Sequence, residues 1–379
     1  MNNVMLSVQA FSQPMLAVSG EKLLNFFSSP EIIAVYWALI LFLVSVLVSA
    51  ILIALHLIRK STDSIPEDIR ALLADAQNIQ KGNIKKVNTG NGRFPQLARI
   101  DEELAERTPP AYDSATLEEI CQSFQAYAAG KMGLYYEIAD IRRFVAGMGI
   151  SKLVILRGIS GTGKTSLAYA AGEFFGNSST IVPIQPMWKE RSDLIGYFNE
   201  FTKKFNETTM LSKLYEAGGR GDLYFTVLDE VNISRIEYYF AEFLSLLEIP
   251  DASKRYVDVV ADTWASDPKR LKNGKLLLPE NMWFIGTANN DDSTFAISDK
   301  VYDRAAVLDL DRKCAPFTAE AASVCHISYA ELTRLFTEAK ETYALSDESR
   351  EKLAKLDAYM SEVFRVSFGN RILRQIESY

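Results

Sequence analysis

A short segment of the chain has the residue types and the spacing of a loop that binds a triphosphate. It reads GISGTGKT and fills every fixed position of the pattern G-x-x-x-x-G-K-[ST]. Its backbone N–H groups, together with the start of a following helix, can surround phosphates. Lys164 adds a positive charge, and the Thr165 hydroxyl can reach Mg²⁺. The residues that we expect to contact the nucleotide are Gly158, Ser160, Gly161, Thr162, Gly163, Lys164, Thr165 and Ser166.

Two adjacent acids further along the chain could take part in hydrolysis. Asp229 and Glu230 come directly after an apolar run that is rich in β-forming residues. An acid at the end of such a strand can hold Mg²⁺, and a carboxylate beside it can orient or deprotonate the attacking water. We therefore assign Asp229, with Thr165, to the metal, and Glu230 to the role of general base.

Three more positions offer groups suited to phosphoryl transfer. Asn289 follows another apolar run, where its amide could touch the γ-phosphate or the water. Arg304 lies in a segment that could face a neighbouring subunit, and a planar guanidinium is well suited to the charge that develops in this reaction. Near the C-terminus, Arg371 and Arg374 offer one further cation.

These residues need strands that end at one edge of a sheet. The apolar runs at residues 152–156, 223–228 and 282–286 predict buried strands, each followed by candidate site residues. The run at residues 165–175 predicts a helix that begins directly after the loop. The fold class that we expect is therefore α/β.

Taken together and in this order, the motifs resemble those of the AAA+ ATPases, and within them the MoxR/McrB-like branch. The resemblance begins near Ala115 and continues to the end of the chain. Besides the loop, it is carried by QPMW at 185–188, DLIGY at 193–197, DEVN at 229–232, RIEYYF at 235–240 and GTAN at 286–289.

The resemblance implies a role for each remaining candidate. Asn289 would be the sensor 1 residue, Arg304 the arginine finger that acts across a subunit boundary, and either Arg371 or Arg374 the sensor 2 arginine. It implies a P-loop NTPase domain with a parallel sheet flanked by helices at residues 115–312, and a helical lid, partial as far as the sequence extends, at 313–379. It also implies a homo-oligomer, usually a hexameric ring, with ATP or GTP and Mg²⁺ at each interface. ATP is the commoner nucleotide in the family, whereas McrB proteins use GTP.

The same resemblance suggests an ATPase that remodels a partner. The McrB likeness favours defence against foreign DNA with a separately encoded effector, and the MoxR likeness favours a chaperone that matures complexes. The alternative from another class is a nucleotide-sensing scaffold with little turnover, against which Glu230 and Arg304 argue. A net charge of -7 indicates no overall attraction to nucleic acid, although a local patch could still bind it.

An apolar segment upstream predicts a membrane anchor. It begins at Ile32 and ends at Ile58, contains no Asp, Glu, Lys or Arg, and as a helix would be about 40 Å long, enough for a bilayer core of about 30 Å. The cations Arg59 and Lys60 directly follow this segment, whereas Lys22 is the one Lys or Arg in the sequence before it. The positive-inside tendency therefore predicts an external N-terminus and a cytoplasmic ATPase. We expect a single-pass protein of the cytoplasmic membrane. Its parts are an external segment at 1–30, the span at 31–60 and a linker at 61–114, in which residues 66–80 have the spacing of a short helix.

Two other groups of residues are informative. Four cations surround the turn signal Asn273-Gly274 between two β-like stretches, where a hairpin could grip a peptide or a phosphate backbone. The simpler alternative is a solvated basic loop. These cations are Lys269, Arg270, Lys272 and Lys275.

The three cysteines, Cys121, Cys314 and Cys325, lack C-x-x-C spacing, which argues against disulfides and structural zinc and suits a reducing cytoplasm.

Overall fold

The computed structural model of the chain describes residues 92–289, 291, 294–320 and 322–379, without the side chains of residues 370 and 371. The predicted membrane span and the predicted linker helix at 66–80 lie outside these residues. Within the described part of the chain, no helix has the length and the apolar character that crossing a bilayer requires.

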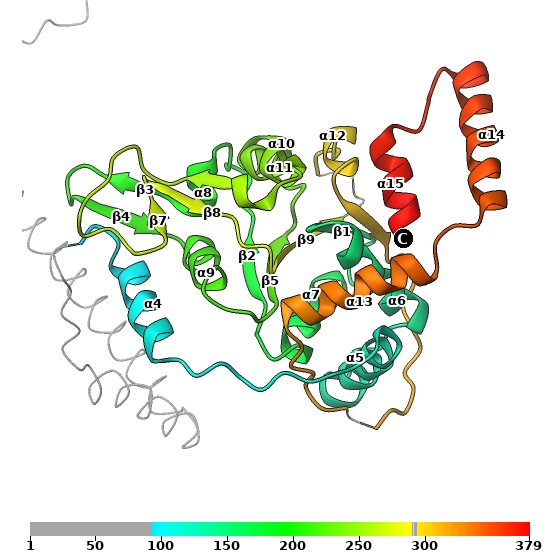
Figure 1. Cartoon of the computed structure of the whole chain (residues 1–379), viewed down its shortest axis with the longest axis horizontal. Coiled ribbons are helices and arrows are strands. Elements are labelled where there is room, and N and C mark those ends of the chain that lie inside the picture. The colour runs from blue at the N-terminus through cyan, green and yellow to red at the C-terminus, as the bar shows by residue number, and fades with distance from the viewer. Residues whose placement is uncertain (1–91, 290, 292–293, 321) are drawn as a thin grey trace, which may run out of the picture. The chain divides into compact units, whose positions relative to one another are not determined.

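A five-stranded sheet forms the centre of the described part (Figure 1). All neighbouring strands run parallel. In spatial order they are β10 (Ala306–Asp309), β1 (Leu153–Gly158), β9 (Met282–Asn289), β5 (Tyr224–Asp229) and β2 (Thr180–Pro183). The three inner strands β1, β9 and β5 are buried almost throughout, because both faces of the parallel sheet are covered there. The α/β class and the parallel sheet flanked by helices are thereby confirmed.

Helices cover both faces of this sheet, and alternate residues of each strand enter one core or the other. Val154 and Leu156 of β1 point into the first core, and Leu153 and Ile155 point into the second. The first core is closed by α5 (Leu117–Met132), α6 (Ile138–Ile150), α7 (Lys164–Phe174) and α13 (Tyr329–Thr342). The second is closed by α4 (Pro95–Glu106), α8 (Arg191–Ile195), α9 (Thr209–Ala217), α10 (Ile236–Tyr239) and α11 (Ala241–Glu248).

The segment at 236–248 forms the two short helices α10 and α11 and not one continuous helix. The break falls at Phe240, whose backbone has φ -107° and ψ 6°. Its ring lies fully buried, 5.0 Å from the ring of Phe243 and 5.2 Å from that of Phe284. Packing of this aromatic cluster against β9 therefore coincides with the interruption of the helix.

Two small antiparallel sheets accompany the second core. The first is the hairpin of β3 (Gly196–Asn199) and β4 (Lys204–Glu207). The second consists of β6 (Tyr256–Asp258), β8 (Lys275–Leu277) and β7 (Leu271–Lys272), in that order, after the single turn η1 (Ala252–Lys254). Asn273 and Gly274 join β7 to β8 with φ of 53° and 72°, the left-handed pair that a two-residue hairpin turn requires.

Helix α4 occupies residues that the sequence assigns to the linker. Its first N–H groups have no side-chain cap from their own segment. Instead, the Glu207 carboxylate at the end of β4 accepts hydrogen bonds from the backbone N–H groups of Gln96 (2.9 Å) and Leu97 (2.8 Å). Leu97 and Ile100 are buried in the second core. The helix was not predicted because its cap comes from a strand more than a hundred residues away.

The last helix of the described part, α15 (Asn370–Ser378), lies on the side of the sheet where β10 begins. A short helix, α12 (Asp299–Tyr302), precedes that strand, and α13, α14 (Asp347–Phe364) and α15 come after it. The Gln375 side chain of α15 donates a hydrogen bond of 3.2 Å to the carbonyl of Asp303, just before β10. Because the strands are parallel, α15 therefore lies at the amino edge of the sheet (Figure 1).

Candidate nucleotide site

The glycine-rich loop sits between β1 and α7, at the carboxyl edge of the sheet. Gly163 is the residue before α7 and has φ 90°, and Gly161 has φ 79°. A Cβ at Gly158 would lie 2.4 Å from the carbonyl oxygen of Leu310, so this position accepts only glycine. The Tyr136 hydroxyl donates a hydrogen bond of 2.9 Å to the carbonyl of Gly163. The loop is thus fixed at the start of α7, where the first N–H groups of a helix can bind phosphates.

Lys164 lies in the mouth of this loop. The residue is only 6% exposed, and its ammonium donates to the loop carbonyls of Gly158 (2.9 Å) and Ile159 (2.7 Å). Burial lowers the pKa of Lys164, and the charge of Asp229 opposes this shift. A phosphate in the loop would bring a negative charge into contact with this ammonium, which in the structure donates only to carbonyls among the described residues.

Asp229 and Thr165, the predicted metal ligands, are in direct contact. The Oδ1 atom of Asp229 accepts hydrogen bonds from the hydroxyls of Thr165 (2.8 Å) and Thr287 (2.7 Å). Hydroxyl and carboxylate oxygens are the ligands that Mg²⁺ prefers, so these two side chains fit that ion. When bound, Mg²⁺ neutralises charge on the phosphates. Among the described residues, no group of three or more His, Cys, Asp or Glu converges on a metal position.

Glu230 has a backbone conformation that is unusual for its residue type. Its φ is 57°, in the left-handed region that non-glycine residues seldom adopt, and its N–H donates to the Thr287 hydroxyl at 2.9 Å. The side chain is exposed and forms no ion pair within the described part of the chain. Such outliers cluster at functional sites, and an unpaired carboxylate beside Asp229 is suited to accept a proton from water.

Asn289 ends β9 directly beside the loop. In the parallel register it lies opposite Gly158, the first residue of the loop motif. Its carbonyl accepts a hydrogen bond of 2.8 Å from the amide of Asn232, a residue that is 5% exposed. The strand order β1-β9-β5 therefore brings the loop, Asn289 and Asp229 to one edge, as the three strand ends predict.

Thr287 and Asn232 are site residues that the sequence reasoning missed. The hydroxyl of Thr287, which is 2% exposed, joins the Asp229 carboxylate to the N–H of Glu230. The amide of Asn232 joins the segment after β5 to the end of β9. Both residues stand inside the motifs GTAN and DEVN. Their polar side chains at strand ends were the available signal.

Arg304 lies at the opposite edge of the sheet. It precedes β10, and its carbonyl accepts a hydrogen bond of 2.6 Å from the hydroxyl of Ser151, which precedes β1. Its guanidinium pairs with Glu248 at the end of α11 (2.6 Å). The six residues of β1, at about 3.3 Å each, put roughly 20 Å between this edge and the loop. Arg304 is therefore too far away to contact a nucleotide in its own loop.

Arg374 lies near Arg304 rather than near the loop. The two arginines line one cleft of about 440 Å³ at the amino edge, together with Lys152 and Arg255. Burial lowers the pKa of Lys152 to about 7, while Glu280 opposes that shift. A sensor 2 contact from Arg374 to its own nucleotide is not seen in this arrangement. The side chain of Arg371, the other candidate, is outside the described part, so that assignment stays a prediction.

Fold and site together define a P-loop nucleoside triphosphatase. Residues 153–305 match a family profile described as "AAA domain (dynein-related subfamily)". The matched range holds the loop, both acids, Asn289 and Arg304. The chain thus carries an AAA+ ATPase domain, and this part of the sequence-based assignment is confirmed.

Two solved structures are similar to the chain. One is a "putative ATPase" from Cytophaga hutchinsonii, which is 12% identical with a TM-score of 0.44, over 75% of this chain and 79% of that one. The other is a full-length MCM homolog from Methanopyrus kandleri, which is 11% identical with a TM-score of 0.39, over 72% of this chain and 56% of that one. No curated protein sequence matches the chain.

Proposed function

We propose that the chain is a membrane-anchored ATPase whose nucleotide sites are completed by a neighbouring copy in a ring, and that hydrolysis remodels a partner. The observation that carries this proposal is the separation between the loop at the carboxyl edge and Arg304 at the amino edge. A planar guanidinium that cannot serve its own site is suited to the site of the next subunit.

Each side chain then has a distinct part in the reaction. The start of α7 and Lys164 bind the phosphates, while Thr165 and Asp229 hold Mg²⁺. Glu230 accepts the proton of the water that attacks the γ-phosphorus, and Asn289 orients that water. The bond from the γ-phosphorus to the β–γ bridging oxygen breaks, so the nucleoside diphosphate leaves and inorganic phosphate forms. Arg304 of the adjacent copy stabilises the charge that builds up on the transferred phosphoryl group.

The wider setting follows from the sequence. AAA+ ATPases commonly form rings, and we propose a hexamer. The segment from Ile32 to Ile58 would anchor the ring in the cytoplasmic membrane, with the ATPase domain in the cytoplasm. Within this proposal, the McrB likeness favours defence against foreign DNA, with complex maturation of the MoxR kind or nucleotide sensing as alternatives.

Mixed assemblies test whether two copies share one site. In the full chain, Glu230→Gln and Arg304→Ala should each lower the turnover of ATP by at least about a hundredfold, since a general base and an arginine finger each contribute that much or more. Both variants should still bind nucleotide. When the two are mixed, a site with an intact Glu230 can receive an intact Arg304 from its neighbour, so activity should return.

The controls separate binding from catalysis. Lys164→Ala should lose nucleotide binding in its own loop. It keeps Arg304, however, and can donate this arginine to the intact loop of an Arg304→Ala neighbour, so it is not an inert partner. We therefore use the double variant Lys164→Ala, Arg304→Ala as the inert partner. The reference mixture combines Arg304→Ala with this double variant. If the mixture of Glu230→Gln with Arg304→Ala turns over ATP no faster than the reference mixture, the shared site is refuted. Running ATP and GTP in parallel identifies the nucleotide.

A further inference from the structure

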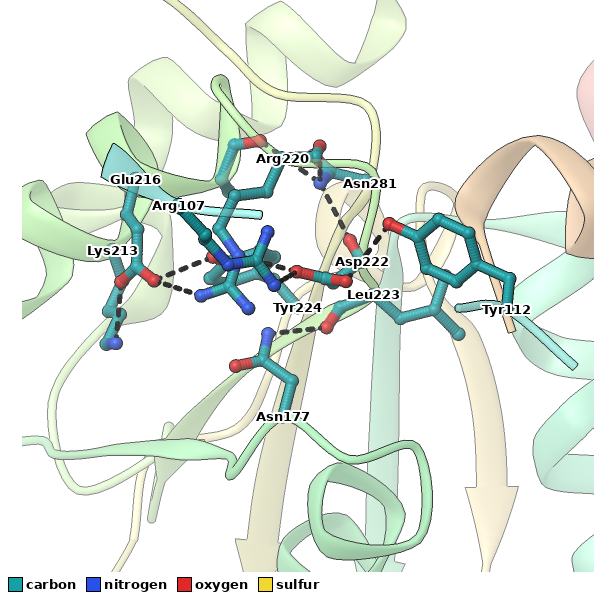
Figure 2. A network of polar contacts seen from close by, with 11 residues as sticks. Arg107, Tyr112, Asn177, Lys213, Glu216, Arg220, Asp222, Leu223, Tyr224 and Asn281 are labelled. Atoms are coloured by element: carbon teal, nitrogen blue, oxygen red, sulfur yellow. Dashed lines mark hydrogen bonds and ion pairs between the residues drawn. The ribbon is translucent and has the colours of Figure 1, made fainter. Parts of the chain in front are cut away.

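A second cleft opens at the amino side of the sheet, separate from the nucleotide site. It has a volume of about 560 Å³ and lies between the turn after α9, the small sheet of β6 to β8 and the first residues of α13. Asn281, in the lining, connects the residue before β9 to the turn after α9, because its side-chain amide donates to the carbonyls of Ala217 (3.1 Å), Arg220 (2.9 Å) and Asp222 (2.8 Å). Figure 2 shows how this asparagine meets the network around Asp222.

The arginines that line the cleft already have acidic partners. Arg220 forms ion pairs with Glu216 and, at 2.5 Å, with Asp222 (Figure 2). Arg270 pairs with Asp101 of α4 at 3.1 Å, and its guanidinium lies 5.6 Å from the centre of the Tyr215 ring. These cations are therefore largely neutralised and serve the fold.

The two lysines that line the cleft have no such partner. The side chains of Lys269 and Lys272 are exposed and form no ion pair anywhere in the described part of the chain. Lys275, the remaining member of the basic cluster predicted from the sequence, pairs with Asp258 at 2.7 Å and does not line the cleft. Of the four clustered cations, only two are thus available to a ligand.

The same cleft also presents apolar surface. Leu277 is 39% exposed and Tyr256 is 36% exposed, and both line it. Glu280 is the one acid in the lining, and its charge acts on the buried ammonium of Lys152. The cleft therefore combines two unpaired positive charges with an apolar floor, in a protein whose net charge is -7.

We propose that this cleft binds an acidic segment of a partner protein that also carries a large apolar side chain. Carboxylates of the segment would pair with Lys269 and Lys272, and the apolar side chain would cover Leu277 and Tyr256. A nucleic acid fits less well, because a phosphate backbone offers only charge and would leave the apolar floor exposed to water. The cleft is remote from the carboxyl edge, so this inference does not depend on the hydrolysis mechanism proposed above.

A labelled peptide tests the proposal with the full chain. The probe is a synthetic decapeptide in which Asp or Glu alternates with Leu or Phe, and fluorescence anisotropy measures its binding. The variant with both Lys269→Ser and Lys272→Ser should bind at least about tenfold more weakly, since two charge-assisted contacts are lost. Lys275→Ser is the matched control and should bind as the wild type does. Leu277→Asp should weaken binding as well.

Further binding measurements separate the contribution of the apolar side chains from that of charge alone. A decapeptide with Ser in place of Leu and Phe should bind weakly, and a single-stranded oligonucleotide should compete poorly. Lys164→Ala should bind the peptide normally, so a failed hydrolysis proposal leaves this one intact. The proposal is overturned if the wild type does not bind the peptide, if the double lysine variant binds it equally well, or if the oligonucleotide binds more tightly than the peptide. Equal thermal unfolding of the variants and the wild type verifies that they fold.

Discussion

At the scale of single residues, the hydroxyl of Thr287 is the unexpected element of the site. It donates to the Asp229 carboxylate at 2.7 Å and accepts from the N–H of Glu230 at 2.9 Å. The left-handed backbone of Glu230 is therefore supported by a side chain from the next strand. One threonine positions both acids, the first through its carboxylate and the second through its backbone.

Substituting Thr287 with Val should slow catalysis without preventing nucleotide binding. Valine keeps the shape of the side chain but removes two hydrogen bonds, each worth about 1 kcal/mol or more, so we expect turnover to fall at least about tenfold. Steady-state hydrolysis at saturating ATP measures this, and a fluorescent nucleotide measures binding. Thr226→Val is the matched control, because Thr226 is similarly buried on β5 and its hydroxyl donates to the Met282 sulfur at 3.5 Å, with no hydrogen bond to either acid among the described residues. Equal losses in the two variants would contradict the role of Thr287.

Glu248 is expected to act as a positioning residue for Arg304. Their ion pair of 2.6 Å directs a guanidinium whose Nε atom is buried and has no hydrogen-bond acceptor in the described part of the chain. Glu248→Gln should reduce turnover in the assembled protein by several-fold, because the orientation of the Arg304 guanidinium is then less well fixed. This loss should be smaller than that of Arg304→Ala, which removes the guanidinium. Glu242→Gln, at the salt bridge with Arg191 (2.9 Å), is the control. A loss of nucleotide binding in Glu248→Gln would argue for a different role.

At the scale of elements, α4 is part of the ATPase domain because several distant segments hold it. Arg93, directly before it, is 1% exposed and forms ion pairs with Asp262 (2.5 Å) and Asp267 (2.8 Å). Its guanidinium also lies 4.6 Å from the centre of the Trp264 ring. The hydrogen bond with Asp267 raises the pKa of Arg93. Residues before α4 are thereby attached to the loop that leads into β7.

Arg93→Met should destabilise the domain strongly. It leaves the side chain of Asp267, which is 4% exposed, without its partner, and removing one member of a buried pair costs about 3–5 kcal/mol. Urea unfolding of the full chain gives the change in free energy. Arg99→Met is the matched control on α4, because Arg99 pairs with Glu103 on the surface and should contribute less than about 1 kcal/mol. Similar losses for both variants would mean that the buried pairs do not stabilise the domain.

At the scale of the whole molecule, the two edges of the sheet have different tasks. The carboxyl edge collects the loop, Asp229 and Asn289, whereas the amino edge carries Arg304 and the acidic-peptide cleft. Tyr224 begins β5 and Met282 begins β9 at the amino edge, and the same strands end at the catalytic residues. A partner in the cleft and a neighbouring subunit would therefore both meet the edge that faces away from the bound nucleotide.

The membrane anchor is a prediction about the whole chain that extraction can test. Val44→Arg combined with Val46→Arg puts two charges near the middle of the apolar segment, at a cost of about 2.5–3.5 kcal/mol each. We expect the wild type to resist alkaline extraction from membranes and this variant to be released. Val87→Arg, outside the segment, is the control and should stay membrane-bound. Release of the wild type itself would rule out a transmembrane anchor.

Local patterns were sufficient to predict much of the catalytic edge. The loop, the strands that end at Asp229 and Asn289 and the helix at Thr165 each depend on a few neighbouring residues, and the structure has these elements within three residues of the expected bounds. A buried parallel strand has a nearly continuous apolar sequence, and a strand end is where polar residues begin. These signals are short-range, so a single sequence contains them.

What the tertiary structure decided are the contacts between residues far apart in the chain. Arg304 and Arg374 lie at the amino edge, and Glu207 caps α4. Thr287 connects the two acids of the site. Among the basic residues of the cleft region, Arg270 and Lys275 form ion pairs, whereas Lys269 and Lys272 form none in the described part of the chain. Each outcome depends on the order of strands in the sheet and on which side chains packing brings within hydrogen-bond reach. The strand order and these long-range contacts are not encoded in the spacing of neighbouring residues. The phosphate loop and the two acids at the end of β5 are encoded there, because each is a short motif of adjacent residues.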